Sequence, residues 1–124
     1  EVLIHRDNNA SMMQAKLFID GDECTIIQAD GMIFSTPTGS TAYNISAGGS
    51  LISPTVPCIA LTPICPHTLS FRPVIVSDSS IIHITIPKNA RTMPKITLDG
   101  KFPFQLEQTD IIQIQASKYP LSTF

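Results

Sequence analysis

Charge, cysteine and long apolar runs are all scarce in this sequence. Only 15% of its 124 residues are charged, tryptophan is absent, and cysteine occurs three times. No apolar run approaches the roughly 20 residues that a membrane-spanning helix needs. Because 43% of the residues are hydrophobic, the low charge does not indicate a disordered chain, which would combine low hydrophobicity with high net charge. We expect a globular protein with one core, outside the membrane.

The scarcity of cysteine argues against two classes of small protein. Cys24, Cys58 and Cys65 are odd in number and form no CxxC pair, so neither a disulfide framework nor a zinc knuckle is indicated. Cys65 lies two residues before His67, but one cysteine and one histidine make only half of a metal site. We expect reduced, mostly buried thiols, no metal bound by this chain, and a reducing compartment.

The charge balance and the first residues bear on partners and location. The formal net charge is −2 and no run of Lys and Arg occurs, so nothing attracts nucleic acid electrostatically. The opening letters EVLIHRDNN carry neither the basic start nor the apolar stretch of a secretion signal. We expect a cytoplasmic protein without a nucleic-acid partner, whose sequence begins as if it were cut from a longer chain.

Short segments rich in β-branched residues recur along the chain. Apolar and polar residues alternate in HITI and IIQIQ, which places Ile82, Ile84 and Ile86 on one face and Ile112 and Ile114 on another. Six further segments are bounded by turn formers. The predicted strands are residues 16–19, 24–29, 32–36, 58–62, 73–76, 83–86, 95–98 and 111–115. We therefore expect at least eight strands.

Turn residues indicate antiparallel pairing and little helix. The pairs Asp20-Gly21 and Asp99-Gly100 suit two-residue hairpins, since a type I′ turn requires positive φ at both central residues. Ten prolines remove backbone donors, notably in SPTVP and TPICPH, and so disfavour long helices. We predict a mainly β protein, a β-sandwich-like domain or partly closed barrel of largely antiparallel strands, forming one domain over residues 1–124.

One bend departs from the strand pattern. After an apolar segment the chain reads TPTGSTAY, and from Ser40 the letters STAYNISAGG lack alternation. Ser40 and Thr41 suit a helix N-cap, and Gly48-Gly49 suits a helix end, so we expect a helix of about two turns. A glycine turn before a helix presents backbone N–H groups, hydroxyls and the helix dipole to an anion or nucleotide. On spacing alone, a purely structural cap is the favoured interpretation.

Longer segments of the sequence resemble those of one enzyme family. The P-loop, GxGxxG and GxSxG motifs are absent. However, residues 30–50 (DGMIFSTPTGSTAYNISAGGS) and 61–73 (LTPICPHTLSFRP) closely resemble the C-terminal domain of NAD kinases, and PICPH with SFRP is most similar to eukaryotic-type members. The resemblance extends from EVLIHR through IDG and LDGK to YPL. It implies a β-sandwich-like domain that binds NAD.

The resemblance also implies what lies outside this chain. In the family, a separate N-terminal domain with a GGDGT motif binds ATP and supplies the catalytic aspartate, and no GGDGT occurs here. The implied parent enzyme uses ATP and Mg²⁺, or another divalent metal, to phosphorylate the adenosine 2′-hydroxyl of NAD. The implied fragment has no catalytic residue and binds NAD without turning it over. A homo-oligomer, either a dimer or a tetramer, is implied as well.

Specific NAD contacts follow from the same resemblance. Asp30 matches a contact on the nicotinamide-ribose side, the word TAYNIS matches adenine and ribose contacts, and Glu1 matches the glutamate of an Asn-Glu pair. Asp99 matches a loop near the nicotinamide, although a hairpin turn explains it equally well. The implied NAD-binding residues are Glu1, Asp30, Thr41, Ala42, Tyr43, Asn44, Ser46 and Asp99.

Several alternatives remain open at this point. Tyr43 and Ala47, four residues apart, are also typical of a buried helix face, and Asp30-Gly31 of a simple turn. The chain as a whole also fits a non-enzymatic nucleotide-binding or oligomerising β-module, or the acceptor domain of a related lipid kinase, although TPTGSTAY with PICPH favours NAD over lipid. Because a separate domain would cover part of the nucleotide cleft, we further expect exposed apolar surface, with self-association or marginal stability.

Overall fold

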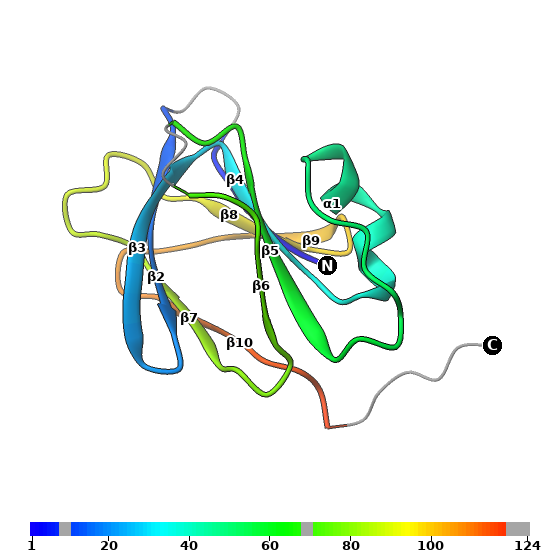
Figure 1. The fold of residues 1–124 in the computed structure, drawn as a ribbon. Helices are drawn as coiled ribbons and strands as arrows, with labels where there is room; N and C mark the ends of the chain where they lie inside the picture. The colour runs from blue at the N-terminus through cyan, green and yellow to red at the C-terminus, as the bar shows by residue number, and fades with distance from the viewer. Residues whose placement is uncertain (8–10, 68–70, 119–124) are drawn as a thin grey trace.

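Two β-sheets pack face to face in the structure, a computed structural model that describes residues 1–7, 11–67 and 71–118 (Figure 1). One sheet has six strands in the order β6-β5-β4-β1-β8-β9, and the other has four in the order β10-β7-β2-β3. The strand pairs described are all antiparallel. The prediction of a mainly β, sandwich-like fold is confirmed. Within the same ranges, no helix is long and apolar enough to span a bilayer.

Twelve elements are present in the described ranges, and only two of them are helical. In chain order they are β1 (Val2–His5), β2 (Met13–Ile19), β3 (Asp22–Ala29), β4 (Gly31–Ser35), the 3₁₀ turn η1 (Thr38–Thr41), the helix α1 (Tyr43–Ser46), β5 (Cys58–Ile64), β6 (Val74–Ser77), β7 (Ile82–Thr85), β8 (Lys95–Leu98), β9 (Lys101–Gln105) and β10 (Ile111–Ile114).

The core lies between the two sheets and follows the period of two that strands impose on their side chains. In β7, Ile82 and Ile84 are buried, as predicted, and Ile86 just beyond the strand is buried too. The buried core residues of this layer are Ile4, Met13, Ala15, Leu17, Ile27, Ala29, Met32, Phe34, Ile59, Leu61, Ile82, Ile84, Ile86 and Leu106. This alternation fixes the register of each strand, because a slip of one residue would turn its apolar side chains to solvent.

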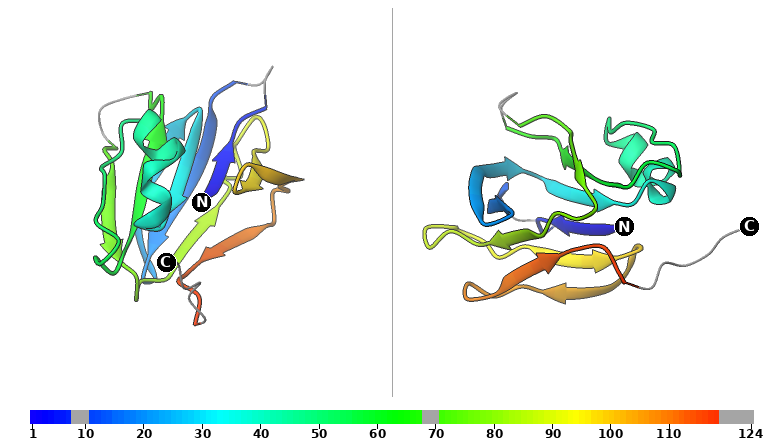
Figure 2. Two further views of the ribbon diagram at one scale, coloured as in Figure 1. Left: turned by 90° about the vertical axis from the view of Figure 1, so that its right-hand side faces the viewer. Right: turned by 60° about the horizontal axis from the view of Figure 1, so that its bottom comes forward.

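β4 and β5 are buried along almost their whole length because both faces of this part of the sheet are covered. Met32 and Phe34 of β4 point into the core, so Ile33 between them faces the opposite side, where it is also fully buried. The covering material is the chain between β4 and β5, including α1 (Figure 2). A second small cluster forms there from Ile52, Cys58 and Ala60.

Both predicted hairpins are confirmed by their backbone geometry. Asp20 and Gly21, between β2 and β3, have φ values of 52° and 85°, and Asp99 and Gly100, between β8 and β9, have 49° and 72°. Positive φ at both central residues is the requirement of a type I′ turn. The Asp20 carboxylate also accepts a hydrogen bond from the Ile81 N–H at 2.9 Å. This bond ties the first hairpin to the residues before β7.

Two strands, β1 and β9, were not predicted from the sequence. β1 has only four residues, and β9 contains Pro103, which usually argues against a strand. β9 tolerates this proline because it is an edge strand of the six-stranded sheet, where one side of the backbone needs no partner. β2 begins at Met13, three residues before the predicted start, and β6 is shifted by one residue to Val74–Ser77.

The predicted two-turn helix is wrong in its start and its capping. The chain forms one 3₁₀ turn and one α-helical turn, separated by Ala42 with φ −88° and ψ −132°. Neither piece has a side-chain cap, and Ser40, predicted as an N-cap, lies inside the 3₁₀ turn and is fully buried. The predicted end is confirmed, because Gly48 has φ +87° and its N–H donates to the Ile45 carbonyl at 2.9 Å.

The prediction of mostly buried thiols is also wrong. All three cysteines are free, but only Cys58 is buried, whereas Cys24 and Cys65 are exposed. Cys24 lies near the start of β3, beside the Asp20-Gly21 hairpin, and Cys65 directly follows β5. Cys24 lies in the exposed first part of β3 and Cys65 lies just beyond the last residue of β5, so both side chains face solvent.

Candidate functional site

The bend between β4 and α1 presents its side chains to solvent. Thr41, Ala42, Tyr43 and Ser46 are all exposed, with Tyr43 at 45%. The alternative that Tyr43 and Ala47 form a buried helix face is therefore wrong, since Ala47 is only half-buried. We call residues 38–46 the exposed turn. Its backbone, hydroxyls and one aromatic ring are accessible to a ligand.

Side-chain hydroxyls shape this turn by bonding to nearby backbone groups. The Thr36 Oγ1 accepts a hydrogen bond from the Gly39 N–H at 3.1 Å, which starts the turn two residues earlier than predicted. The Thr41 hydroxyl donates back to the Thr38 carbonyl at 3.2 Å. Because α1 has only four residues, its dipole gives little support to an anion site at this turn. Hydrogen bonding and stacking are what the turn offers.

Asn44 differs from its neighbours because it is fully buried. Its amide nitrogen donates to the Ser50 carbonyl at 3.0 Å, and its amide oxygen accepts a hydrogen bond from the Thr62 hydroxyl. Both polar groups of the side chain therefore have protein partners. Of the residues in the segment TAYNIS that are expected to contact a ligand, Asn44 is the one whose side chain faces the protein interior.

Glu1 and Asp99 lie together beside the end of β4. The Asp99 N–H donates to the Glu1 carbonyl at 2.8 Å, and the Glu1 amino group contacts Oδ1 of Asp99. The Asp99 side chain is 82% exposed, whereas that of Glu1 is only 14% exposed. Oε2 of Glu1 is buried and has no hydrogen-bond partner among the described residues.

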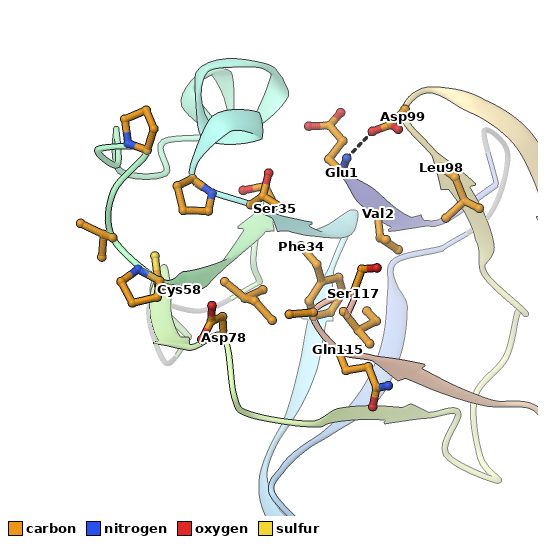
Figure 3. A pocket seen from close by; sticks show the side chains of 18 of the residues that line it. Glu1, Val2, Phe34, Ser35, Cys58, Asp78, Leu98, Asp99, Gln115 and Ser117 are labelled. Carbon is orange, nitrogen blue, oxygen red and sulfur yellow. Dashed lines mark hydrogen bonds and ion pairs between the residues drawn. The ribbon is translucent and has the colours of Figure 1, made fainter. Parts of the chain in front are cut away.

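A pocket of about 670 Å³ opens next to this pair (Figure 3). Glu1 and Asp99 form one side, and Phe34, Ser35 and Thr36 lead from the wall of the pocket to the exposed turn. The remaining wall comes from Val2, Pro37, residues 54–59, Asp78, Leu98 and residues 114–117. Its volume falls within the range of about 300–1,000 Å³ that is common for small-molecule sites.

The predicted residues divide between this pocket and the turn beside it. Glu1 and Asp99 line the pocket, while Thr41, Ala42, Tyr43 and Ser46 are exposed but do not line it. The pocket also uses residues that sequence reasoning missed, namely Phe34, the 54–59 segment and Ile114. These side chains come from separate strands and loops, and no local pattern in the sequence links them.

Asp30 is not brought together with the other predicted residues. It precedes β4, whereas the exposed turn follows β4, so the five residues of that strand separate them by about 17 Å. The Asp30 carboxylate accepts a hydrogen bond from Nε of Arg6 at 2.8 Å, and both side chains are about one third exposed. Its backbone bonds to Arg6 and Ile64 at 2.9 Å. Within one chain, Asp30 therefore lies at the end of the sheet opposite to the exposed turn.

Metal-ligating groups do not gather in the part of the chain that the structure describes. No group of three or more His, Cys, Asp or Glu side chains there is placed to hold a metal ion. Cys65 and His67, which sequence reasoning judged half of a site, lie just after β5.

Comparison with known proteins places this geometry in a family. The chain matches the ATP-NAD kinase C-terminal domain over residues 1–124. It is 47% identical over 123 residues to the NAD(+) kinase of Saccharomyces cerevisiae, covering 99% of this chain and 23% of that protein. It spans between 12% and 25% of the length of four curated relatives that it matches.

Two solved structures are similar to the present one. A yeast NADH kinase complexed with NADH has a TM-score of 0.75 and 42% identity, covering 91% of this chain and 33% of that one. An NAD kinase from Archaeoglobus fulgidus in complex with ATP has a TM-score of 0.84 and 31% identity, covering 97% and 45%. The family match along the whole chain, together with the two-sheet fold and its exposed TPTGSTAY turn, shows that the chain belongs to the family of ATP-NAD kinase C-terminal domains.

Proposed function

We propose that this chain is the NAD-binding part of an NAD kinase, an enzyme that transfers the terminal phosphate of ATP to the 2′-hydroxyl on the adenosine side of NAD. The observation that carries the proposal is the exposed turn, whose accessible backbone, hydroxyls and Tyr43 ring lie next to a pocket of nucleotide size. Membership of the family supports NAD as the acceptor over a lipid. The yeast relative that was solved with NADH supports a pyridine dinucleotide as ligand.

In the proposed site, the dinucleotide lies along the exposed turn and reaches toward the pocket. The Tyr43 ring supplies a flat apolar surface for a base, and Thr41, Ala42 and Ser46 supply hydrogen bonds from backbone and hydroxyl groups. Glu1 lines the pocket, and its carboxylate accepts a hydrogen bond from a ribose hydroxyl or an amino group of the ligand. Asp99, exposed at the rim of the pocket, contacts the other end of the molecule.

Asp30 reaches such a ligand only from a second copy of the chain. It lies about 17 Å along β4 from the turn, which is beyond the reach of one side chain. A homo-oligomer in which the Asp30 end of one copy meets the turn of another would bring the two together. We therefore propose a dimer or tetramer as the form in which Asp30 contacts the ligand.

The ATP half of the reaction is assigned to polypeptide outside these 124 residues. Phosphoryl transfer depends on positioning the acceptor, the donor and a divalent metal, and this chain offers only an acceptor site. The Archaeoglobus relative was solved with ATP, which supports ATP as the donor in a longer protein. Mg²⁺ or another divalent ion would there supply positive charge that offsets the negative charge of the ATP phosphates.

Calorimetric titration of the chain with NAD tests the proposal. We expect saturable binding with a Kd of about 1 mM or lower, and at least tenfold weaker binding by Tyr43→Ala, because the substitution removes the stacking surface. Leu51→Ala is the matched control, since Leu51 is 70% exposed in the same connection but lies outside the turn. Binding of similar strength in wild type, Tyr43→Ala and Leu51→Ala would contradict the proposed site.

The role of Asp30 is tested by measuring how the effect of Asp30→Asn on NAD binding changes with protein concentration. We expect Asp30→Asn to weaken NAD binding where the chain is oligomeric and to leave it unchanged where dilution yields monomers. A loss of affinity that is equal at all concentrations would show that the assignment to a second copy is wrong. A chain that binds a diacylglycerol dispersion and not NAD would instead favour the lipid-kinase alternative.

A further inference from the structure

The exposed turn is anchored to the sandwich by polar side chains instead of apolar ones. In η1 the only buried residue is Ser40, and in α1 the only buried residue is Asn44. The apolar side chains of α1 point outward, with Tyr43 at 45% and Ile45 at 44% exposure. Short helices in proteins normally depend on burial of an apolar face for their stability. Here hydrogen bonds from polar side chains must supply the stability that a buried apolar face would otherwise give.

Asn44 joins three separate segments through its side chain. Its amide nitrogen donates to the Ser50 carbonyl at 3.0 Å and lies 3.4 Å from the Ser40 carbonyl. Its amide oxygen accepts a hydrogen bond from the hydroxyl of Thr62. Thr62 belongs to β5 and is 1% exposed, on the face of the sheet opposite the core residue Leu61. One amide thus links the turn, the returning chain and the rigid sheet.

Ser40 adds a second link of the same kind. Its hydroxyl donates to the Pro37 carbonyl at 2.6 Å and accepts a hydrogen bond from the Ile52 N–H at 3.1 Å. Ile52 packs with Cys58 and Ala60 on the outer face of the sheet. The start of the turn is therefore held to a residue that is itself anchored by apolar packing.

Gly49 is fitted to the Asn44 amide. A Cβ atom at position 49 would lie 2.2 Å from Oδ1 of Asn44 and 2.5 Å from its Cγ, far inside van der Waals contact. The Gly49 N–H also donates to the Asn44 backbone carbonyl at 2.8 Å. The chain after α1 thus closes on the amide from the other side and leaves it a single orientation.

We propose that Asn44 is a positioning residue, held by Thr62, that sets the orientation of the exposed turn for its ligand without touching that ligand. This inference rests on the proposed function for the identity of the ligand. Hydrogen bonds depend on direction as well as distance, so two bonded ends of one amide fix the turn more narrowly than apolar contact would. Thr41, Ala42 and Tyr43, which present the ligand-binding groups, lie on the same short turn directly before Asn44.

Thr62→Val is the sharpest test, because it removes one hydroxyl from β5 at nearly constant volume and leaves the turn itself unaltered. The buried amide oxygen of Asn44 then loses its partner. Two measurements are made on the full chain. Amide hydrogen exchange, followed by NMR, measures how strongly the backbone amides of Gly49 and Ile52 are protected. Calorimetry measures the Kd for NAD.

We expect exchange at Gly49 and Ile52 to accelerate about tenfold while exchange in β2 and β7 is unchanged, and the Kd for NAD to rise about tenfold, a factor equivalent to losing one buried hydrogen bond. Thr62→Ser keeps the hydroxyl and should restore both values to within about threefold. Gly49→Ala, which displaces the amide from the other side, should reproduce the effects of Thr62→Val.

Thr97→Val is the matched control, because the Thr97 hydroxyl oxygen is buried without a hydrogen-bond partner and its removal breaks no bond. Exchange that is unchanged in Thr62→Val, or accelerated equally in both sheets, would overturn the inference. Local acceleration with an unaltered Kd would overturn the link to the ligand. If the unsubstituted chain binds no NAD, the proposed function fails, and the exchange data alone decide whether Asn44 holds the turn.

Discussion

At the scale of single residues, Cys58 shows how the outer layer of the sandwich changes side-chain chemistry. It begins β5 and packs with Ile52 and Ala60 under the connection between β4 and β5. Burial raises the pKa of its thiol above the ordinary value of 9.0, and the negative charge of Asp78 raises it further. Cys24 and Cys65 lie exposed on the same chain and serve as internal references.

The first prediction concerns the reactivity of these thiols. At pH 8 we expect a thiol-specific reagent to label Cys24 and Cys65 much faster than Cys58, because Cys58 is buried and its raised pKa keeps its thiol protonated. Mass spectrometry of labelled peptides measures the three rates. Asp78→Asn should speed labelling of Cys58 only slightly, since burial is the larger cause of the raised pKa. Equal rates at all three positions would contradict this account.

The same pKa predicts how stability depends on pH. The folded protein keeps Cys58 protonated to a higher pH than the unfolded chain does, so the folded state binds more protons in between. The resulting contribution to stability is fully present below about pH 9 and is lost as the pH rises through the folded-state value. Urea unfolding between pH 8 and pH 10 should show a steeper loss of stability in wild type than in Cys58→Ala.

Residue types in the turn were predictable from the sequence, but their burial was not. The resemblance of TPTGSTAY singled out the right bend, and Thr41, Ala42 and Tyr43 are exposed there. Asn44 stands in the same word and is fully buried, because one side of a single helical turn must face the sheet. Which residue does so depends on the kink at Ala42, and that kink has no signature in the local sequence.

At the scale of elements, β4 is the strand that the rest of the site is built on. It pairs with β1 on one side and β5 on the other, and it delivers the chain into the exposed turn. Gly31 at its start lies close to β1, where a Cβ atom would come within 2.9 Å of the Ile4 carbonyl oxygen and 3.1 Å of Cδ1 of Ile64. The backbone of β1 cannot yield easily, because it is paired on both sides.

We therefore expect Gly31→Ala to destabilise the fold by about 1–3 kcal/mol, the usual range for overpacking a well-packed interior. Urea denaturation measures the change in the free energy of unfolding. Thr109→Ala, at an exposed position outside the strands, is the control and should stay within about 0.5 kcal/mol of wild type. A Gly31→Ala protein as stable as wild type would show that β1 and β4 are less closely apposed than described.

Elements that are marked by particular residues in the local sequence were predicted from it. Elements that form only by pairing with a neighbouring strand were not. Asp20-Gly21 and Asp99-Gly100 demand an unusual backbone that few residues adopt, so both hairpins follow from the sequence. β9 became a strand only because β8 lies beside it, with Ile96 opposite Phe104. Its proline argues against a strand when the segment is considered alone.

At the scale of the whole molecule, apolar side chains remain exposed on the hairpin formed by β8 and β9. Phe102 is 68% exposed, Phe104 56% and Leu98 42%. β9 is also an edge strand, with one side of its backbone unpaired within its sheet. Exposed aromatics on a sheet edge promote association. This agrees with the sequence-based expectation of exposed apolar surface.

We expect the isolated chain to self-associate through this hairpin. Replacing both phenylalanines, Phe102→Ser with Phe104→Ser, should shift the sedimentation-velocity profile toward monomer at the same protein concentration. Ile26→Ser with Leu51→Ser is the matched control, because these residues are similarly exposed but lie on β3 and in the connection before β5. An unchanged profile in the first double variant, or an equal shift in both, would rule out the hairpin as the contact.

The placement of Asp30 shows what the sequence could not give at this scale. Asp30 and Thr41 are eleven residues apart and stand in one continuous segment, residues 30–50, yet an intervening strand puts them at opposite ends of the sheet. Glu1 and Asp99 are far apart in sequence and lie in contact, because β1 pairs with β8. Strand pairing decides both distances, and it depends on the core as a whole.

The measurement that tests the central claim most directly is an NMR titration of the chain with NAD. The account predicts saturable shifts of backbone amides concentrated in residues 36–46 and around Glu1 and Asp99, with much smaller changes in β2, β3 and β7. Shifts that concentrate elsewhere on the sandwich, or the absence of any saturable shift, would contradict the claim that the exposed turn binds the dinucleotide.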